Sequence, residues 1–431
     1  MLTVLRNSWA LLLGMMLLML GNGMQGSLLG IRGGQEHMST FQLSIVMSCY
    51  FLGFLFGSRM VPDMLRRVGH VRVFAALGSM ISAVLILYAV VPHWIAWSLM
   101  RVVIGFSFSG VYITAESWLN DASSNENRGQ ALSLYLIVQM IGIIAAQGLL
   151  NLGDPSGYIL FIIPSVLVSV AFTPILLSVT KAPAFESTKP LSFKQLYNAS
   201  PLGCIGMFIL GGVFSAQFGM AAVWGSQAGL SVREITIFIA GIYLGGMIFQ
   251  YPIGWLSDRM DRRKVILGIS ALGGVGLMIP VIWDVPFWAL CAVGALGGAV
   301  SNPLYSLLLA YVNDYLERSD MAAASAGLLF INGLGAISGP VITGWIMSVV
   351  GPGGFFLFMA LLFMSLSIYA VWRMSQRKNT AEATSGYMAV SPSGTAVVLE
   401  AALTEADGEG PQAETQDGKA QEPRPSFNEG P

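Results

Sequence analysis

The chain has 431 residues, of which 55% are apolar and only 10% charged, and its formal net charge at pH 7 is -1. Soluble domains carry about 25% charged residues, so this composition predicts a protein that faces lipid rather than water. The near-zero net charge, with no stripe of arginines on a polar face, argues against nucleic acid as a partner. The three cysteines fall inside apolar runs and lack metal-ligand spacing, so we expect no metal site.

Apolar runs follow one another along most of the chain. A helix needs about 20 residues to cross the hydrocarbon core, and the first run, 8–31, is too long for the apolar part of a signal peptide. Charged or Gly/Pro-containing stretches separate the runs, which predicts an all-α membrane protein with twelve transmembrane helices. The predicted spans are 8–31, 41–61, 72–91, 94–118, 130–150, 157–179, 202–224, 234–256, 265–283, 287–311, 322–348 and 354–374.

The two halves of the chain resemble each other at an offset of about 193 residues. Segment 48–58 matches 241–251, and segment 116–121 matches 309–314. Duplicated sets of membrane helices are typical of secondary transporters, in which the substrate site lies between the repeats. The repeat predicts two pseudo-symmetric six-helix bundles, 1–180 and 201–377, a cytoplasmic linker, 181–200, and a tail, 378–431.

Basic residues between the predicted spans lie mainly on one side of the membrane. With a cytoplasmic N-terminus, seventeen of them fall inside, and Arg32 and Arg233 fall outside. The positive-inside rule therefore places both termini in the cytoplasm. The tail is polar, acidic and rich in Gly, Pro, Ser and Ala, so it buries too little apolar surface to offset the entropy of ordering. We predict that it is disordered, with a regulatory or docking role as the alternative.

The loop between the eighth and ninth spans carries the most specific motif. Residues 254–264 read GWLSDRMDRRK, which resembles the G-x-x-x-D-R-x-G-R-R signature of the major facilitator superfamily, with Asp261 at the second glycine. In that family the loop helps to hold the outward-open state, and a carboxylate at a helix end can pair with arginine and separate when bundles move. The alternative is that the basic residues only anchor the topology. The predicted gating residues are Gly254, Asp258, Arg259, Arg262 and Arg263.

Arg101 lies inside the fourth predicted span. A central intramembrane arginine costs at least about 2.5–3.5 kcal/mol, so we expect it to face the bundle interior and to find a partner. Tyr112 and Glu116 lie within about 80° of it around the helix, which gives this span one polar face. The pattern R-x-x-x-G at 101–105 also resembles the superfamily's fourth-helix signature, which implies proton coupling or contact with an anion. A structural arginine bonded to backbone carbonyls is the alternative.

Further polar residues in the spans are candidates for a cavity lining. Glu116 is either a protonatable coupling carboxylate or an interfacial partner of Arg128 or Arg67. The others suggest a neutral, hydrogen-bonding site with one cation, although each of them could instead bond a neighbouring helix. The candidate substrate or coupling residues are Arg101, Glu116, Tyr112, Asn22, Gln25, Gln139, Tyr243, Asn302 and Asn332.

Three further stretches narrow the family resemblance. QEHMST at 35–40, ESWLND at 116–121 with NENRG at 125–129, and YVND at 311–314 resemble the YcaD-like bacterial branch of the superfamily. That branch implies an inner-membrane transporter and no particular substrate. We therefore predict a monomeric secondary transporter in the lipid bilayer of the bacterial cytoplasmic membrane. It would move a small polar or amphipathic solute by alternating access, with proton coupling left open.

Other functional classes are less well supported by the sequence. It has no P-loop, no Rossmann glycine pattern, no catalytic triad and no metal-ligand spacing, so we expect neither an enzyme nor a cofactor. A multidrug-type efflux transporter is one alternative, which the incomplete antiporter signature of the fifth span disfavours. A non-transporting membrane receptor or assembly partner, with the tail as its docking segment, is the other.

Overall fold

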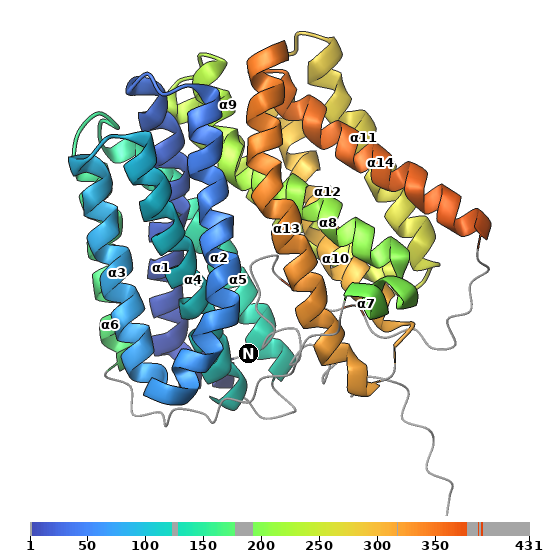
Figure 1. Cartoon of the computed structure of the whole chain (residues 1–431), viewed down its shortest axis with the longest axis horizontal. Helices are drawn as coiled ribbons and strands as arrows, with labels where there is room; N and C mark the ends of the chain where they lie inside the picture. The colour runs from blue at the N-terminus through green and yellow to red at the C-terminus, as the bar shows by residue number, and fades with distance from the viewer. Residues whose placement is uncertain are drawn as a thin grey trace, which may run out of the picture.

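The computed structural model is built from helices (Figure 1). It describes residues 2–122, 128–176, 193–316, 318–376, 387 and 389–390. Within these ranges, eleven helices are long and apolar enough to cross a membrane, and the sixth predicted span is the shorter apolar helix α6 (Ile159–Leu176). The continuous long helices are α1 (Leu2–Gln35), α2 (Thr40–Val68), α3 (His70–Val90), α4 (Trp94–Ala122), α5 (Arg128–Leu149), α10 (Val232–Ser257), α11 (Arg262–Ile282), α12 (Phe287–Asn313), α13 (Arg318–Val350) and α14 (Gly354–Gln376).

The seventh span is not the continuous helix that the sequence predicted over 202–224. It consists of α8 (Pro201–Ser215), a π-helical turn η2 (Ala216–Met220) and α9 (Ala221–Gln227). A π turn interrupts the regular hydrogen bonding of a helix and is frequent at functional sites. Two short helices complete the described elements: η1 (Leu150–Leu152) at the end of the fifth span, and α7 (Phe193–Ala199) in the predicted linker.

The helices form two bundles, α1–α6 and α8–α14, which lie side by side in Figure 1. Their packing repeats: α2 packs against α4 as α10 packs against α12, α1 against α5 as α8 against α13, and α3 against α6 as α11 against α14. The contacts between the two bundles are also symmetric, because α2 contacts α13 and α10 contacts α5. The predicted all-α fold of two pseudo-symmetric bundles is therefore confirmed, and it leaves a site at the interface of the repeats.

Equivalent helices of the two bundles begin in the same way. Ser39 and Gln42 form a capping box at the start of α2, in which the Ser39 hydroxyl accepts from the Gln42 N–H at 3.2 Å. Ser231 and Glu234 form the matching box at the start of α10, at 3.3 Å. Such a box satisfies two backbone N–H groups that the helix itself leaves unpaired. The repeat thus extends to the residues that fix where these helices start.

Glycines set the close approach of the paired helices. A Cβ atom on Gly105 of α4 would overlap the Tyr50 carbonyl oxygen of α2. In the second bundle, a Cβ atom on Gly298 of α12 would overlap the Ile242 carbonyl oxygen of α10 in the same manner. Small residues of this kind let membrane helices pack backbone to backbone. Each of these two helix pairs therefore behaves as one tightly packed unit.

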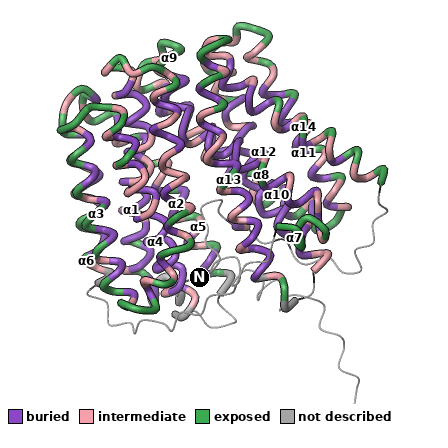
Figure 2. The backbone as a smooth tube through the Cα atoms, viewed as in Figure 1, coloured by how far each residue is buried: buried purple, intermediate pink, exposed green. Residues whose placement is uncertain are grey.

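The outer surface of the protein is apolar. Figure 2 shows buried residues along the helices that face one another and exposed residues along the outer helices, such as α3 and α6. Many of the exposed side chains are large and apolar, including Leu99, Val166, Trp345 and Ile368. Apolar patches of this extent are rare on soluble monomers. The exposed surface therefore fits contact with lipid chains.

The glycine contact between α2 and α4 yields a stability prediction. Gly105→Ala should lower the melting temperature of the purified protein, because overpacking of this kind costs about 1–3 kcal/mol. Gly268→Ala is the matched control, since its Cβ atom would meet no atom within 4 Å. The control should melt at or slightly above the temperature of the parent protein, because alanine favours a helix over glycine. Equal melting of the two variants in detergent would contradict the proposed helix contact.

Candidate functional site: a central cavity and the 254–264 loop

A cavity lies between the two bundles. Residues of α1, α2, α4 and α5 line one side, and residues of η2, α10, α12 and α13 line the other. It encloses about 1260 Å³ of empty space, including space open to solvent. Among the described residues that line it, Arg101 carries a charge and none is a carboxylate. The predicted residues that line the cavity are Asn22, Gln25, Arg101, Tyr112, Tyr243, Asn302 and Asn332.

Arg101 is held by side chains of neighbouring helices. Its side chain is buried, and its Nη1 donates to Gln25 Oε1 at 2.7 Å. Its Nη2 lies 3.4 Å from Met47 Sδ, and the guanidinium carbon lies 4.8 Å from the centre of the Tyr50 ring. These contacts differ from the structural alternative, in which the arginine bonds backbone carbonyls. None of them neutralises the charge, so the guanidinium can still attract an anionic or acceptor group of a ligand.

The hydrogen bonding continues from Arg101 to α1 and back to α4. Gln25 Nε2 donates to Asn22 Oδ1 at 3.0 Å. Asn22 Nδ2 in turn donates to Tyr112 Oη at 3.3 Å. Four residues singled out from the sequence are therefore joined in one network on the wall of the first bundle. The network orients each amide, so the donors and acceptors that face the cavity are fixed in place.

The opposite wall combines aromatic rings with amides. Tyr243 stacks on Phe218 with ring centroids 5.0 Å apart and planes 15° apart, and Phe218 belongs to the π turn η2. Asn302 Nδ2 donates to the Gly298 carbonyl at 3.3 Å, while its buried Oδ1 has no hydrogen-bond partner in the described part of the chain. Asn332 Nδ2 donates to the Met207 carbonyl at 3.0 Å. This wall offers a flat apolar surface beside polar atoms.

Two predicted residues, Glu116 and Gln139, do not belong to the residues that line the cavity. Glu116 is buried and accepts a hydrogen bond from Tyr135 Oη at 3.3 Å, while the side chain of Arg128 lies outside those described. Gln139 is also buried, although its repeat partner Asn332 faces the cavity. The α5 glutamine that lines the cavity is instead Gln147, two helical turns further along the helix. The sequence analysis did not predict Gln147 as a lining residue.

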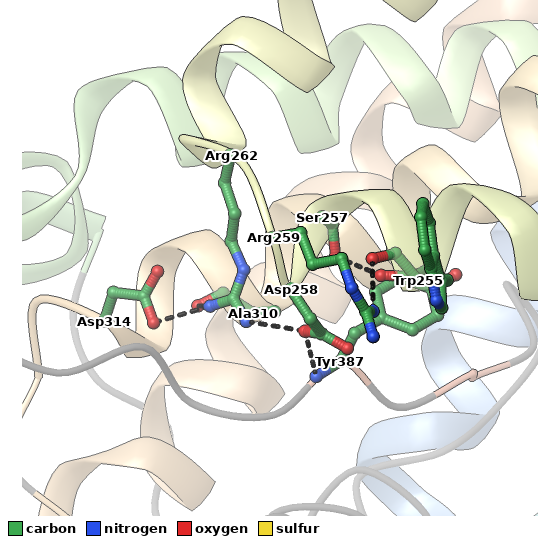
Figure 3. A network of polar contacts seen from close by, with 9 residues as sticks. Trp255, Ser257, Asp258, Arg259, Arg262, Ala310, Asp314 and Tyr387 are labelled. Atoms are coloured by element: carbon green, nitrogen blue, oxygen red, sulfur yellow. Dashed lines mark hydrogen bonds and ion pairs between the residues drawn. The ribbon is translucent and has the colours of Figure 1, made fainter.

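The 254–264 loop holds a buried ion pair (Figure 3). Arg262 Nη1 lies 2.6 Å from Asp314 Oδ1, and both side chains are at most 4% exposed. Asp258 is the weaker partner, because it lies 3.5 Å from Arg262 Nη2 and is 41% exposed. Sequence reasoning did not assign Asp314 to this cluster. The signal for it was present, since Asn313–Asp314 repeats Asn120–Asp121.

The remaining gating candidates pair separately from Asp258. Asp261 caps α11 by accepting from the Arg263 N–H at 3.0 Å, and it forms an ion pair with Arg263 Nη2 at 2.8 Å. The hydrogen bonds from Arg263 hold the pKa of the Asp261 carboxyl below its usual value, so it is ionised at neutral pH. Arg259 lies over the Trp255 ring, 4.1 Å from its centroid. The carboxylate at the second glycine position therefore acts as a helix cap.

The equivalent loop of the first bundle is simpler. There the sequence has Pro62 in place of Gly254 and Arg66 in place of Asp258, which favours a role in topology anchoring. The described ion pair, between Asp63 and Arg66, is exposed on both sides. Exposed pairs contribute about 0–1 kcal/mol. No group of three or more His, Cys, Asp or Glu side chains among the described residues is placed to hold a metal ion.

Comparison with known proteins decides the family. The model of the Major Facilitator Superfamily matches residues 11–239 and 203–406. The chain belongs to this superfamily. It is 27% identical over 366 residues to an uncharacterized MFS-type transporter, YcaD, of Escherichia coli O45:K1 (strain S88 / ExPEC), a match that covers 80% of this chain and 90% of that protein. The predicted resemblance to YcaD-type transporters is confirmed.

Two solved structures share the fold. The nucleoside transporter NupG matches with a TM-score of 0.67 at 15% identity, covering 86% of this chain and 100% of that one. A bacterial homologue of the human lysosomal transporter Spinster, in an inward-facing and unoccupied conformation, matches with a TM-score of 0.64 at 14% identity, covering 95% and 99%. The protein is therefore a multi-pass secondary transporter of a small solute in the bacterial inner membrane, and not an enzyme.

The buried pair in the loop yields a second stability prediction. Asp314→Ala leaves the Arg262 guanidinium buried without its nearest carboxylate, and breaking a buried pair costs about 3–5 kcal/mol. Asp258→Ala removes a half-exposed carboxylate and should cost about 1 kcal/mol or less. Thermal unfolding of the two purified variants should therefore give a much lower melting temperature for Asp314→Ala.

A double variant provides the control. Arg262→Ala with Asp314→Ala removes both charges, so it should melt above Asp314→Ala alone. The Arg262→Ala single variant is measured as well. If the double variant lowers the melting temperature by the sum of the Arg262→Ala and Asp314→Ala effects, the two residues do not stabilise each other.

Proposed function

We propose that the transporter carries a small amphipathic solute with an anionic or acceptor-rich polar group, and that Arg101 contacts this group. The observation that supports the proposal is the charge of the cavity: among its described lining residues, one arginine stands without a carboxylate. A cationic solute would leave two like charges in a poorly solvated site, which costs free energy. A carboxylate or phosphate ester would instead receive two hydrogen bonds from the planar guanidinium.

The rest of the cavity suits the rest of such a solute. The Tyr243–Phe218 stack offers a flat face for an apolar or aromatic part. The free Oδ1 of Asn302 can accept a hydrogen bond from a solute hydroxyl or amine. Because NupG is a nucleoside transporter with the same fold, nucleosides and nucleoside monophosphates belong among the test ligands. A multidrug-type efflux function is less well supported, since the lining lacks a described carboxylate for cationic drugs.

The two ends of the bundle interface differ, which supports alternating access. At one end small residues meet closely: a Cβ atom on Gly30 would overlap Ala222, and one on Gly344 would overlap Ser44. Toward the 254–264 loop, a second cavity lies between α5 and α10, with about 1220 Å³ of empty space that includes space open to solvent. If this loop faces the cytoplasm, as the positive-inside rule predicts, the conformation is inward-facing. We propose that rocking of the two bundles reverses this difference.

Coupling and assembly complete the proposal. Glu116 remains our candidate proton carrier, and its hydrogen bond from Tyr135 gives it a partner on α5. Proton transfer through it would act at a distance from the cavity, because Glu116 does not line it. The protein acts as a monomer in this proposal, since each bundle closes its own core. The termini lie in the cytoplasm.

Substitution of Arg101 tests the substrate contact. Arg101→Gln should abolish uptake of the substrate while the protein still inserts and remains monodisperse. Arg101→Lys keeps the charge but loses the two-pronged geometry, so it should retain weaker binding. Ligands are found by a thermal-shift screen at two pH values, in which a ligand at about 100 times its Kd adds roughly 2.7 kcal/mol. Each carboxylate is paired with its neutral primary amide.

The expected pattern is stabilisation by an acid and less by its amide in the parent protein, with no difference between them in Arg101→Gln. Equal stabilisation by acid and amide in the parent protein would contradict the assigned contact. Normal uptake by Arg101→Gln would contradict it as well.

The orientation has its own test. A green fluorescent protein fused after Gln376 should fluoresce, and alkaline phosphatase at the same place should be inactive, because the first folds in the cytoplasm and the second outside it. Fusions to the loop between α1 and α2 should give the opposite pattern. An active phosphatase at the C-terminal position would overturn the proposed sidedness.

A further inference from the structure

Part of the tail is packed against the second bundle. The whole segment 378–431 was expected to be disordered, and the structure differs from this expectation at Tyr387 and Val390. The Tyr387 N–H donates to Asp258 Oδ1 at 3.0 Å (Figure 3). The Val390 N–H donates to Ser306 Oγ at 2.9 Å, and Val390 is only 3% exposed. The tail thus bonds both the gating carboxylate and α12.

The site that receives the tail is shaped for it. A Cβ atom on Gly254 would overlap the Tyr387 ring, so the first glycine of the 254–264 motif provides the space in which the ring lies. Ser306 also accepts a hydrogen bond from Gln250 Nε2 at 3.2 Å, which fixes its hydroxyl between α10 and α12. In the sequence, Tyr387-Met-Ala-Val390 is a short apolar stretch within a polar tail.

The docked tail residues lie in the second cavity, next to the central one. Tyr387, Ala389 and Val390 line the second cavity, whose opposite wall is formed by α5 residues such as Ser133. Met140 and Asn302 line both this cavity and the central one. The two cavities are therefore neighbours along one passage, and the tail lies where a solute would leave the central site toward the 254–264 loop.

We propose that Tyr387, Ala389 and Val390 form an autoinhibitory plug. Docked between α10, α12 and the facing α5, it obstructs the passage and keeps the two bundles from closing at this end. Asp258 is engaged by the Tyr387 N–H as long as the plug is docked, so its carboxylate is less available to the gating interactions. The proposal rests on transport by alternating access, and release of the tail would raise the transport rate.

The first test compares two truncations in proteoliposomes. Ending the chain after Gln376 removes the plug, whereas ending it after Leu399 keeps Tyr387–Val390 and serves as the control. The shorter protein should transport roughly three- to tenfold faster, the range expected for releasing a contact of a few weak bonds held at high local concentration. The control should match the full chain. Equal rates for both truncations would overturn the plug.

Point variants and a peptide guard against a folding artefact. Tyr387→Ala with Val390→Asp should reproduce the faster rate in the full-length chain. A synthetic peptide of residues 384–393, added at about millimolar concentration to match a tethered segment, should slow the protein that ends at Gln376. The same peptide carrying the two substitutions should not. Failure of the natural peptide and of the point variants to change the rate would contradict the proposal.

A labelling experiment separates the plug from transport itself. In a background with Cys49, Cys204 and Cys291 replaced by alanine, Leu136→Cys, at a half-buried position of the α5 wall, reports access to the second cavity. A bulky maleimide should label this variant faster in detergent when the chain ends at Gln376 than when it ends at Leu399. Faster labelling without uptake in any variant would support the plug and count against the proposed transport cycle. Equal labelling would overturn the plug whatever the uptake.

Discussion

The burial of the Arg101 charge is the constraint on which the centre of this protein depends. A guanidinium at this depth needs polar partners, and the Gln25 amide, the Met47 sulfur and the face of the Tyr50 ring supply uncharged ones. A carboxylate in this position would have neutralised the charge and removed the attraction for a ligand. Because the partners come from α1 and α2, the same contacts hold the first bundle together around the cavity. The packing of the first bundle and the solute preference that we propose thus follow from one side chain.

The second bundle has the same helix packing but buries its charged residues elsewhere. They lie at the end of the bundle, where Arg262 is buried against Asp314 and Asp261 caps α11. The first bundle has only an exposed Asp63–Arg66 pair in the equivalent loop. The two halves therefore share their helix packing but differ in their charged residues: the first half buries the Arg101 cation near its middle, and the second half buries the Arg262–Asp314 ion pair at its end.

Much of the fold was predictable because the bilayer imposes it. Hydrocarbon thickness fixes the length of an apolar run, so the spans followed from hydropathy, and the repeat paired them. The Arg101–Gln25–Asn22–Tyr112 network was also within reach, since polar side chains in lipid-facing helices must turn inward. The repeat of Asn120–Asp121 marked Asp314 as a notable residue, but its pairing with Arg262 was not predictable, because the two residues lie on different helices and sequence spacing does not report contacts between helices. The π turn that places Phe218 in the cavity, and the docking of Val390, likewise depend on tertiary packing.

The close meeting of Gly30 with Ala222 and of Gly344 with Ser44 has a consequence for the energy supply of the cell. A barrier built from large side chains opens transiently whenever a rotamer changes, and a file of water then crosses it. A glycine backbone packed against alanine or serine leaves few rotamers to change, so we expect such a barrier to conduct few ions between cycles. Each elementary charge that crosses 100 mV dissipates about 2.3 kcal/mol. In the proposed cycle, the glycines at this end would therefore insulate the membrane as well as shape the interface.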